Sequence, residues 1–523
     1  MKLTWMKSVP VKQIVNHNSI DIKNSNFAGL LKLKNDFNLM YIVDLKPTGI
    51  WKYFDEITKI PRPSKKEEKI ISYLIKFGQS LGLDTKKDEA GNVLITKPAT
   101  QGKESVATIV LQSHVDMVAE KNAGVQHDFE KDPIQTVIDG DWVKAQGTTL
   151  GADNGIGVAA QLAILASNDI EHGKIECLFT VDEETGLSGA TALREDFFTG
   201  KILLNLDSED EGEIFIGCAG GGDTIATFEY TTEAVSDTYF FFRIDVSSLK
   251  GGHSGTDIHW GRANANKLLT RFLWESAKKY DLRLSTIQGG NLRNAIPREA
   301  SCIAAVPFED KERVRVDFNL FLQEIEEQYN EIEPLLQVEL SSEDRQAHFI
   351  DRKTTKQLVN ALYACPHGVI TMSQDIPGLV ETSTNLANVK MTSENLITVG
   401  TSQRSAKESE KKDIMQLVES IFTLAGAANI THGDGYPGWT PNPETEILRL
   451  AKNSYKNRFG TEPKITAIHA GLECGLFLKK YPDLEMISFG PTLRDVHSPD
   501  EKLNIPSVQK FWDFLVDILK NIS

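Results

Sequence analysis

The segment Thr149-Leu-Gly-Ala-Asp-Asn-Gly-Ile-Gly157 decides the fold of this chain, because it joins a glycine-rich turn to an apolar helix. The helix is predicted to begin at Asp153 and to run to Leu165 through mostly alanine, valine, isoleucine and leucine. Three short apolar runs have the length of buried strands and lie around it, at residues 106–112, 175–181 and 202–206. Strands that alternate with helices predict an α/β layer architecture.

Further helices and strands are predicted along the chain. Ser64 and Glu67 form a capping-box pattern, and apolar residues then recur at helical spacing as far as Gly82. Four other segments have the pattern of regular structure: a helix at 47–58, a strand beginning at 239, a long helix at 262–280 and a closing amphipathic helix at 508–519.

The length of 523 residues is too great for one ordinary core, so we expect two domains. The character of the sequence changes after the glycines at 220–222 and changes back near the Gly/Pro-rich stretch at 433–438. We therefore predict a main domain in two parts, 46–220 and 434–523, and an inserted domain at 221–433. Residues 1–45 are rich in lysine and asparagine without a sustained period, which predicts a poorly ordered extension.

Composition excludes two classes of partner. Apolar residues make up 40% of the chain and charged residues 25%, as in soluble globular proteins, and no window approaches a membrane-spanning run. The net charge of −16 argues against nucleic acid, whose binding depends on lysine and arginine. The five cysteines include no CxxC pair and the N-terminus has no apolar signal region, so we expect a cytoplasmic protein.

Histidine and carboxylate residues in four short segments, together with one histidine near the end of the chain, indicate a site for two metal ions. Histidine nitrogen and carboxylate oxygen suit divalent transition metals, and one carboxylate can be shared by both ions. No single segment is decisive, but together they favour hydrolytic chemistry. The residues are His114 with Asp116, Asp153, Glu183 with Glu184, Asp207 and His497.

The first two segments each allow a simpler interpretation. His114 and Asp116 follow an apolar strand and point to the same side, so Asp116 can orient a metal-bound His114. Taken alone, the pair favours the simpler interpretation, a strand-end hydrogen bond without a metal ion. Asp153 at a helix start is typical of an N-cap, although the glycines on both sides favour a carboxylate that bridges two ions.

The remaining candidates follow two predicted strands or lie in loops. Glu183 and Glu184 come after the strand at 175–181, where neighbouring side chains diverge, so that one can face a metal ion and the other a water molecule. Asp207 follows the strand at 202–206, the usual place for ligands in an open α/β sheet, or it is only a turn residue. His497 lies in a loop without core periodicity.

Two other histidines are candidates for the site. His253 lies in Gly251-Gly-His-Ser-Gly255, which is too rich in glycine for core packing, and it belongs to the inserted domain. It could polarise a substrate carbonyl. His469 could also belong to the site, although Glu473 four residues later predicts a local ion pair instead.

These motifs resemble a family of di-zinc metallopeptidases that includes carnosinases, peptidase T and succinyl-diaminopimelate desuccinylase, and most closely its aminoacyl-histidine dipeptidases. Ser-His-Val-Asp-Met-Val, Thr-Leu-Gly-Ala-Asp-Asn-Gly-Ile-Gly and Asp-Glu-Glu-Thr-Gly in this order carry the resemblance, which runs from about Leu45 to the C-terminus. It implies an α/β fold in which a di-metal catalytic domain, a mixed sheet flanked by helices, carries an inserted α+β lid domain.

The resemblance also implies a role for each candidate. Asp153 would bridge two zinc ions, with cobalt or manganese as alternatives, while His114 and Asp207 hold one ion and Glu184 and His497 hold the other. Glu183 would be the general base, Asp116 the residue that orients His114, and His253 the oxyanion stabiliser. Asn294 and Arg404 resemble contacts to the substrate carboxylate.

The implied activity is hydrolysis of dipeptides, either of the Xaa-His type or more broadly, by a water that Glu183 activates; a homodimer is left open. An N-acyl amino acid deacylase or desuccinylase with the same metal site is the alternative. A non-catalytic metal- or peptide-binding protein is disfavoured, because it has no use for Glu183. A phosphate-binding loop at 218–222 is also disfavoured, since Gly-Lys-Ser/Thr does not follow it.

Overall fold

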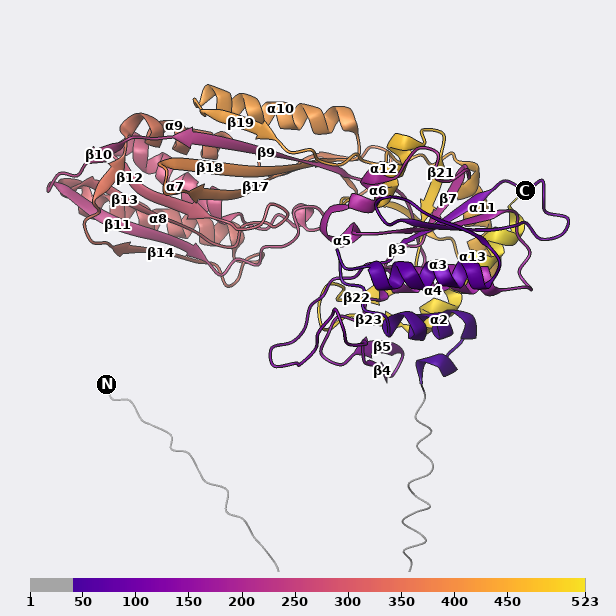
Figure 1. Ribbon diagram of the computed structural model, residues 1–523. Coiled ribbons are helices and arrows are strands. Elements are labelled where there is room, and N and C mark those ends of the chain that lie inside the picture. Colours follow the sequence, from indigo (N-terminus) through magenta and orange to yellow (C-terminus); the bar gives the residue numbers. More distant parts are fainter. Residues whose placement is uncertain (1–40, 523) are drawn as a thin grey trace, which may run out of the picture. The chain divides into compact units, whose positions relative to one another are not determined.

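The computed structural model describes residues 41–522, which Figure 1 shows as a ribbon coloured along the sequence. The predicted extension at 1–45 lies for the most part outside the described residues. Its last residues have a defined structure, because Ile42–Asp44 form the 3₁₀ helix η1, and Ile42 and Leu45 are buried.

An eight-stranded mixed sheet is the centre of the main domain, and its inner strands run parallel. Neighbouring strands β6, β3, β7 and β21 pair in parallel, whereas β1, β2 and β6 pair antiparallel. The predicted α/β architecture with a mixed sheet is therefore confirmed. In sheet order the strands are β1 (Asp84–Lys87), β2 (Val93–Lys97), β6 (Ile175–Thr180), β3 (Ile109–His114), β7 (Ile202–Asn205), β21 (Glu485–Ser488), β8 (Glu213–Cys218) and β20 (Lys464–Ile468).

Helices cover both faces of this sheet, because successive strand residues point to opposite sides. In β3, Ile109 and Leu111 join one hydrophobic cluster while Val110 joins another. The first cluster packs under α2 (Thr48–Thr58), α3 (Glu68–Ser80), α4 (Ala152–Ala166), α11 (Glu446–Phe459) and α13 (Ile505–Asn521). The second packs under α6 (Ser188–Ala192), which follows α5 (Glu183–Gly186), and under α12 (Glu473–Lys480).

A small four-stranded sheet lies beside this core and holds the loop of His497. Its strands, in order, are β22 (Leu493–Arg494), β23 (Lys502–Asn504), β5 (Trp142–Ala145) and β4 (Thr136–Asp139). Because β22 and β23 pair antiparallel, the loop between them returns His497 toward the main sheet.

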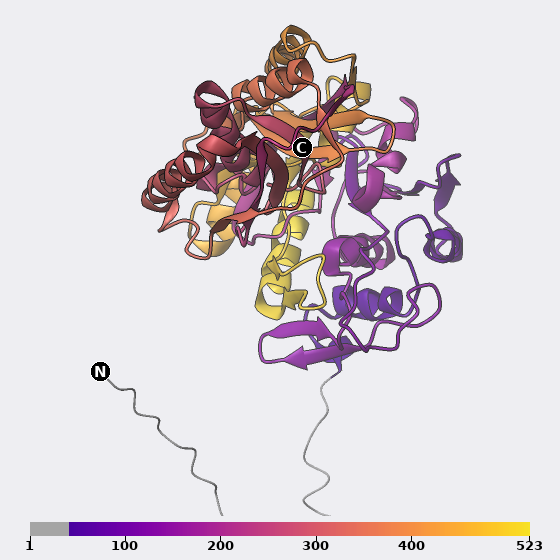
Figure 2. The ribbon, with the colours of Figure 1, turned by 90° about the vertical axis from the view of Figure 1, so that its left-hand side faces the viewer.

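A separate nine-stranded sheet is formed by residues 220–432. Four helices share one hydrophobic cluster with it, and Figures 1 and 2 show α7, α8 and α9 on the same face. The predicted bounds of 221 and 433 stay a prediction. The strands are β14 (Gln337–Ser342), β11 (Tyr239–Ser247), β13 (Ala300–Pro307), β12 (Arg283–Gly289), β17 (Val380–Met391), β18 (Leu396–Ser405), β9 (Gly220–Glu229), β19 (Asn429–His432) and β16 (Gly368–Met372).

Shorter elements complete this sheet. Strands β10 (Thr232–Ala234) and β15 (His348–Ile350) form a separate two-stranded sheet. Two 3₁₀ helices, η2 (Ile258–Trp260) and η3 (Phe308–Asp310), lie in the connections of the nine-stranded sheet. The four helices are α7 (Ala265–Lys279), α8 (Lys311–Tyr329), α9 (Arg352–Ala364) and α10 (Glu408–Leu424).

One local prediction is wrong in detail. Helix α3 begins at Glu68, and Ser64 does not cap it, because its hydroxyl donates instead to Asp116 Oδ2 at 2.8 Å. The carboxylate of Glu67 accepts from the amides of Lys65 and Asp182. The stretch at 218–222, for which a phosphate-binding loop was disfavoured, forms the end of β8 and the start of β9.

All five cysteines are buried and unpaired. Among residues 41–522 no helix combines the length and the apolar character needed to cross a membrane.

The turn that precedes α4 is held by two buried charged residues from distant parts of the chain. Glu501 accepts from the amides of Leu150, Gly151 and Ala152 at 2.7, 2.9 and 2.7 Å, and from that of Asp153 at 3.3 Å. Arg62 donates to carbonyls on the other side, those of Val115 and Asp116 at 2.9 Å each and that of Gly151.

Gly151 is required in this turn for two reasons. Its φ of 69° lies in the left-handed region, where other residues are strained. A Cβ at this position would also lie 2.7 Å from both Arg62 Nη2 and Met117 Sδ. The glycine therefore lets Arg62 reach the backbone.

Replacing Glu501 should destabilise the main domain. We expect Glu501→Ala to lower the free energy of unfolding by about 2–4 kcal/mol, because four amides lose their acceptor in a buried place. Urea denaturation followed by circular dichroism measures the change. Asp500→Ala, at the exposed neighbouring residue, is the control; equal effects of the two variants would contradict the role given to Glu501.

Candidate metal centre

The parallel strands bring the predicted ligands to one edge of the main sheet. His114 is the last residue of β3, and Asp207 lies two residues beyond β7, which pairs with β3. His114 Nε2 lies 3.4 Å from Asp207 Oδ1. The imidazole is buried, so its polar atoms have little access to solvent.

Asp153 faces two histidines with its two carboxylate oxygens. Its Oδ1 lies 3.2 Å from His114 Nε2, and its Oδ2 lies 3.3 Å from His497 Nε2. The N-cap residue of α4 is Gly151, and Asp153 has non-helical dihedral angles inside the first turn. The alternative prediction of Asp153 as an N-cap is therefore wrong, and its carboxylate is free to bridge two ions.

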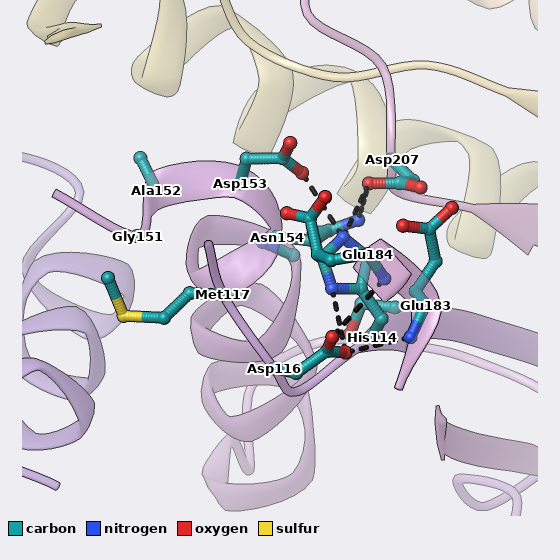
Figure 3. Close-up of polar contacts among 12 residues, drawn as sticks. His114, Asp116, Met117, Gly151, Ala152, Asp153, Asn154, Glu183, Glu184 and Asp207 are labelled. Atoms are coloured by element: carbon teal, nitrogen blue, oxygen red, sulfur yellow. Dashed lines mark hydrogen bonds and ion pairs between the residues drawn. The ribbon is translucent and has the colours of Figure 1, made fainter. Parts of the chain in front are cut away.

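Glu184 completes a second group of donors around His497. Glu184 Oε2 lies 2.9 Å from His497 Nε2, so Glu184 and Asp153 each place a carboxylate oxygen beside the same imidazole nitrogen. Figure 3 shows the carboxylates of Asp153, Glu184 and Asp207 around His114. The arrangement has two halves that share Asp153: His114 and Asp207 on one side, and His497 and Glu184 on the other.

The electrostatics of the cluster favour cations. Hydrogen bonds to Asp153 and Glu184 raise the pKa of His497 to about 11. Burial raises the pKa of Glu184 and of Asp207, because each carboxylate loses solvent beside other acidic groups. Divalent cations would relieve this repulsion, and the nitrogen and oxygen donors fit zinc, cobalt or manganese.

Asp116 connects His114 to the segment that carries the two glutamates. Its Oδ1 lies 3.4 Å from His114 Nδ1, and its carboxylate accepts from the amides of Glu183 at 3.1 Å and Glu184 at 3.2 Å. These glutamates begin the short helix α5 after Asp182, rather than lying at an extended strand end as predicted. Asp116 thus sets the positions of the imidazole and of α5 together.

Glu183 presents its carboxylate on the side of Asp207, away from Asp116 (Figure 3). Burial raises its pKa well above the usual value, and the negative charges of Asp207, Glu473 and Glu184 add to the effect. A carboxyl group with a raised pKa holds a proton more firmly, which suits a group that must accept and return one.

His253 and Arg404 lie together in the inserted domain. His253 Nδ1 accepts from the amides of Gly255 at 3.3 Å and Thr256 at 3.2 Å, so that the neutral ring carries its proton on Nε2. Arg404 Nη2 lies 3.4 Å from this Nε2, and Arg404 Nη1 donates to Tyr436 Oη at 2.7 Å. Burial and the Arg404 charge lower the pKa of His253 to about 4.

Asn294 is exposed near this pair. Its backbone carbonyl accepts from the amide of Ser254 at 2.8 Å, which ties it to the turn of His253. Among residues 41–522 no hydrogen bond joins its side chain to Arg404 or to the metal-binding cluster. Its predicted contact with a substrate stays a prediction.

The profile of peptidase family M20/M25/M40 matches residues 110–521. The chain belongs to this family. It is 43% identical over 478 residues to the cytosol non-specific dipeptidase of Escherichia coli (strain K12), which covers 91% of this chain and 98% of that protein. The predicted resemblance is confirmed.

Two solved structures are similar to this chain over nearly their whole length. Aminoacylhistidine dipeptidase from Vibrio alginolyticus has a TM-score of 0.85 and 45% identity, over 92% of this chain and 98% of that one. Aminopeptidase PepT from Bacillus cereus has a TM-score of 0.57 and 17% identity, over 91% and 99% of the two chains, and shares the fold alone.

The predicted ion pair between His469 and Glu473 is absent from this M20 peptidase. His469 Nε2 lies 2.7 Å from Ser383 Oγ, while Glu473 accepts from Gln112 Nε2 at 2.6 Å and Thr180 Oγ1 at 2.7 Å. The predicted role of Glu473 was this ion pair alone, because its partners Gln112 and Thr180 lie far away along the chain. Burial raises the pKa of Glu473 to about 8.

Glu473 should make the stability of the metal-free peptidase depend on pH. The pKa of Glu473 rises from 4.5 to about 8 on folding, so the folded protein keeps a proton that the unfolded chain loses. The free energy of unfolding should therefore fall as the pH rises from 4.5 to about 8, by at most about 1.4 kcal/mol per pH unit. Glu473→Gln removes this contribution, and urea denaturation at pH 5 to 8 should show the variant gaining on the wild type. Glu444→Gln, at an exposed site, is the control, and parallel curves for Glu473→Gln would contradict the expectation.

Proposed function

We propose that this chain is a metallo-dipeptidase that hydrolyses short peptides at a centre of two divalent ions. The observation that carries the proposal is the position of the Asp153 carboxylate, whose two oxygens each face a different histidine. The relatives named as dipeptidases, which match 91% and 92% of the chain, support it.

Five residues would hold the ions. His114 and Asp207 would bind one, Glu184 and His497 the other, and Asp153 both; we infer zinc, with cobalt and manganese as alternatives. When bound, such ions polarise a carbonyl group and lower the pKa of water from ~15.7 to ~7. Asp116 would keep His114 in the orientation for binding through Nε2, because it faces Nδ1.

Glu183 is the general base in this proposal. Its carboxylate lies beside the ligands without being one of them, and its raised pKa favours proton uptake. It would take a proton from the attacking water and deliver it to the leaving amine. The same group thus serves both halves of the hydrolysis.

The inserted domain would recognise the substrate. His253 presents an N–H that can donate to the carbonyl oxygen as negative charge develops there. Arg404, held by Tyr436, would bind the terminal carboxylate, with Asn294 as a further contact. Two donors only 3.4 Å apart are arranged for acceptor oxygens, which a dipeptide supplies.

The alternatives differ in what they require of the site. An N-acyl amino acid deacylase would use the same ions and base, so the substrate distinguishes it. A non-catalytic binding protein would not need Glu183 beside the ligands. Xaa-His dipeptides are the first substrates to test. We also infer that the protein is cytoplasmic.

Removing the base should abolish turnover without loss of metal. Glu183→Gln should lower kcat by about three orders of magnitude, because general base catalysis contributes about 10²–10⁴-fold. Metal content by mass spectrometry should remain that of the wild type. Glu195→Gln, at an exposed glutamate of the main domain, should keep full activity. A Glu183→Gln enzyme of near-normal rate would refute the assignment.

A substrate panel tests the dipeptidase assignment. We expect kcat/KM to be highest for dipeptides such as carnosine and other Xaa-His peptides, and lower for N-acetyl and N-succinyl amino acids and for dipeptide amides. Arg404→Met should lower kcat/KM for dipeptides by about 10–100-fold and leave the amides nearly unchanged, because only the charged contact is lost. Faster cleavage of the N-acyl compounds would favour the deacylase.

A further inference from the structure

His469 is a buried residue of the main domain that contacts two segments of the inserted domain. It follows β20 directly and precedes α12, so it lies between the central sheet and the helix of Glu473. None of the roles proposed above uses it. Its two contacts lead to the two residues proposed to bind the substrate, Arg404 and His253.

The side chain of His469 reaches the strand beside Arg404. His469 Nε2 lies 2.7 Å from Ser383 Oγ on β17. Ser383 pairs with Arg404 across β17 and β18, which lie side by side in Figure 1. The position of Ser383 therefore sets the backbone from which the guanidinium extends.

The backbone of His469 contacts the turn of His253. A Cβ on Gly255 would lie 2.2 Å from the carbonyl oxygen of His469, 3.0 Å from His253 Cε1 and 3.2 Å from Arg404 Nε. The φ of Gly255 is outside the left-handed region, so space rather than dihedral strain requires glycine here. The turn can approach the main domain only because residue 255 has no side chain.

The charge state of His469 suits this place. Burial and the charge of Arg404 lower its pKa to about 3, so the ring is neutral at physiological pH. A neutral imidazole can bond to Ser383 without adding a second positive charge beside Arg404. The guanidinium also has a buried Nε without a hydrogen-bond partner among the described residues.

We propose that His469 is a positioning residue that holds Arg404 and His253 in place for the substrate, through Ser383 on one side and Gly255 on the other. The inference rests on the proposed dipeptidase function, since it assigns a use to both residues. His469 itself does not touch the substrate in this arrangement. A substitution of its side chain removes the contact with Ser383 and keeps the backbone contact with the turn of His253. Such a substitution should therefore impair recognition of the carboxylate more than the hydrolytic chemistry.

The test compares a dipeptide with the same dipeptide whose C-terminal carboxylate is an amide. In the metal-loaded enzyme, His469→Ala should lower the ratio of the two kcat/KM values by about tenfold or more, because Arg404 loses its fixed position. The lower ratio should come from a higher KM for the dipeptide, while kcat/KM for the amide stays nearly that of the wild type. His469→Gln, which places an amide group near Nε2, should restore much of the ratio.

Ser383→Ala is the second variant and guards against a His469→Ala protein that does not fold. It should lower the same ratio, and the double variant should be no worse than His469→Ala alone, because both act through one contact. Gly255→Ala should lower kcat/KM for both substrates, and more for the dipeptide, because its Cβ would crowd both His253 and Arg404. Gly49→Ala is its control, since a Cβ there would meet only Ala163 Cβ at an ordinary 3.4 Å.

The outcomes separate the two proposals. A wild-type enzyme that does not prefer the dipeptide to its amide would refute the proposed recognition by Arg404. A wild type with this preference, combined with folded His469 and Ser383 variants that keep the ratio, would overturn the positioning role alone. Equal losses of kcat/KM on both substrates in the His469 and Ser383 variants would also overturn it, because such losses indicate a general structural effect.

Discussion

Crowded carboxylates at one edge of the main sheet are the constraint on which the rest of the main domain depends. Because β6, β3 and β7 run parallel, the residues just beyond their carboxyl ends meet. Buried carboxylates repel one another and are costly unless they are paired or hydrogen-bonded. The protein offsets this repulsion with two histidines and with backbone amides that bond to Asp116 and Glu501. What remains unbalanced is negative charge, which divalent cations match.

The geometry of this cluster is a property of the whole main domain rather than of one motif. Glu501, close to the C-terminal helix, holds the amides of the turn before α4. Arg62, close to the start of the described chain, holds carbonyls of the same turn and of the segment after β3. The Asp153 carboxylate can therefore reach both His114 and His497 only when segments from both ends of the chain are folded together.

The sequence predicted the sheet and the histidines and carboxylates of the cluster. A polar residue directly after an apolar strand is visible in the sequence, and parallel strands bring such residues together at one edge of the sheet. It failed where a polar side chain has a distant partner. Ser64 looks like a helix cap, but its hydroxyl donates to Asp116. Glu473 looks like a partner for His469, but it accepts from Thr180 and Gln112. Arg62 and Glu501 belong to no local motif, so only the fold shows their function.

The two groups of predicted site residues, one in each domain, carry opposite charges. The main domain provides the carboxylate cluster, whereas the inserted domain provides Arg404, whose neighbours His253 and His469 are neutral because their pKa values fall to about 4 and about 3. Arg404 is thus the one positive group of these three residues, which matches a substrate with one carboxylate. In the proposed function, the amide to be cleaved must lie at the cations while the carboxylate lies at Arg404. A dipeptide, with one residue between the cleaved amide and the carboxylate, offers both groups in one short molecule.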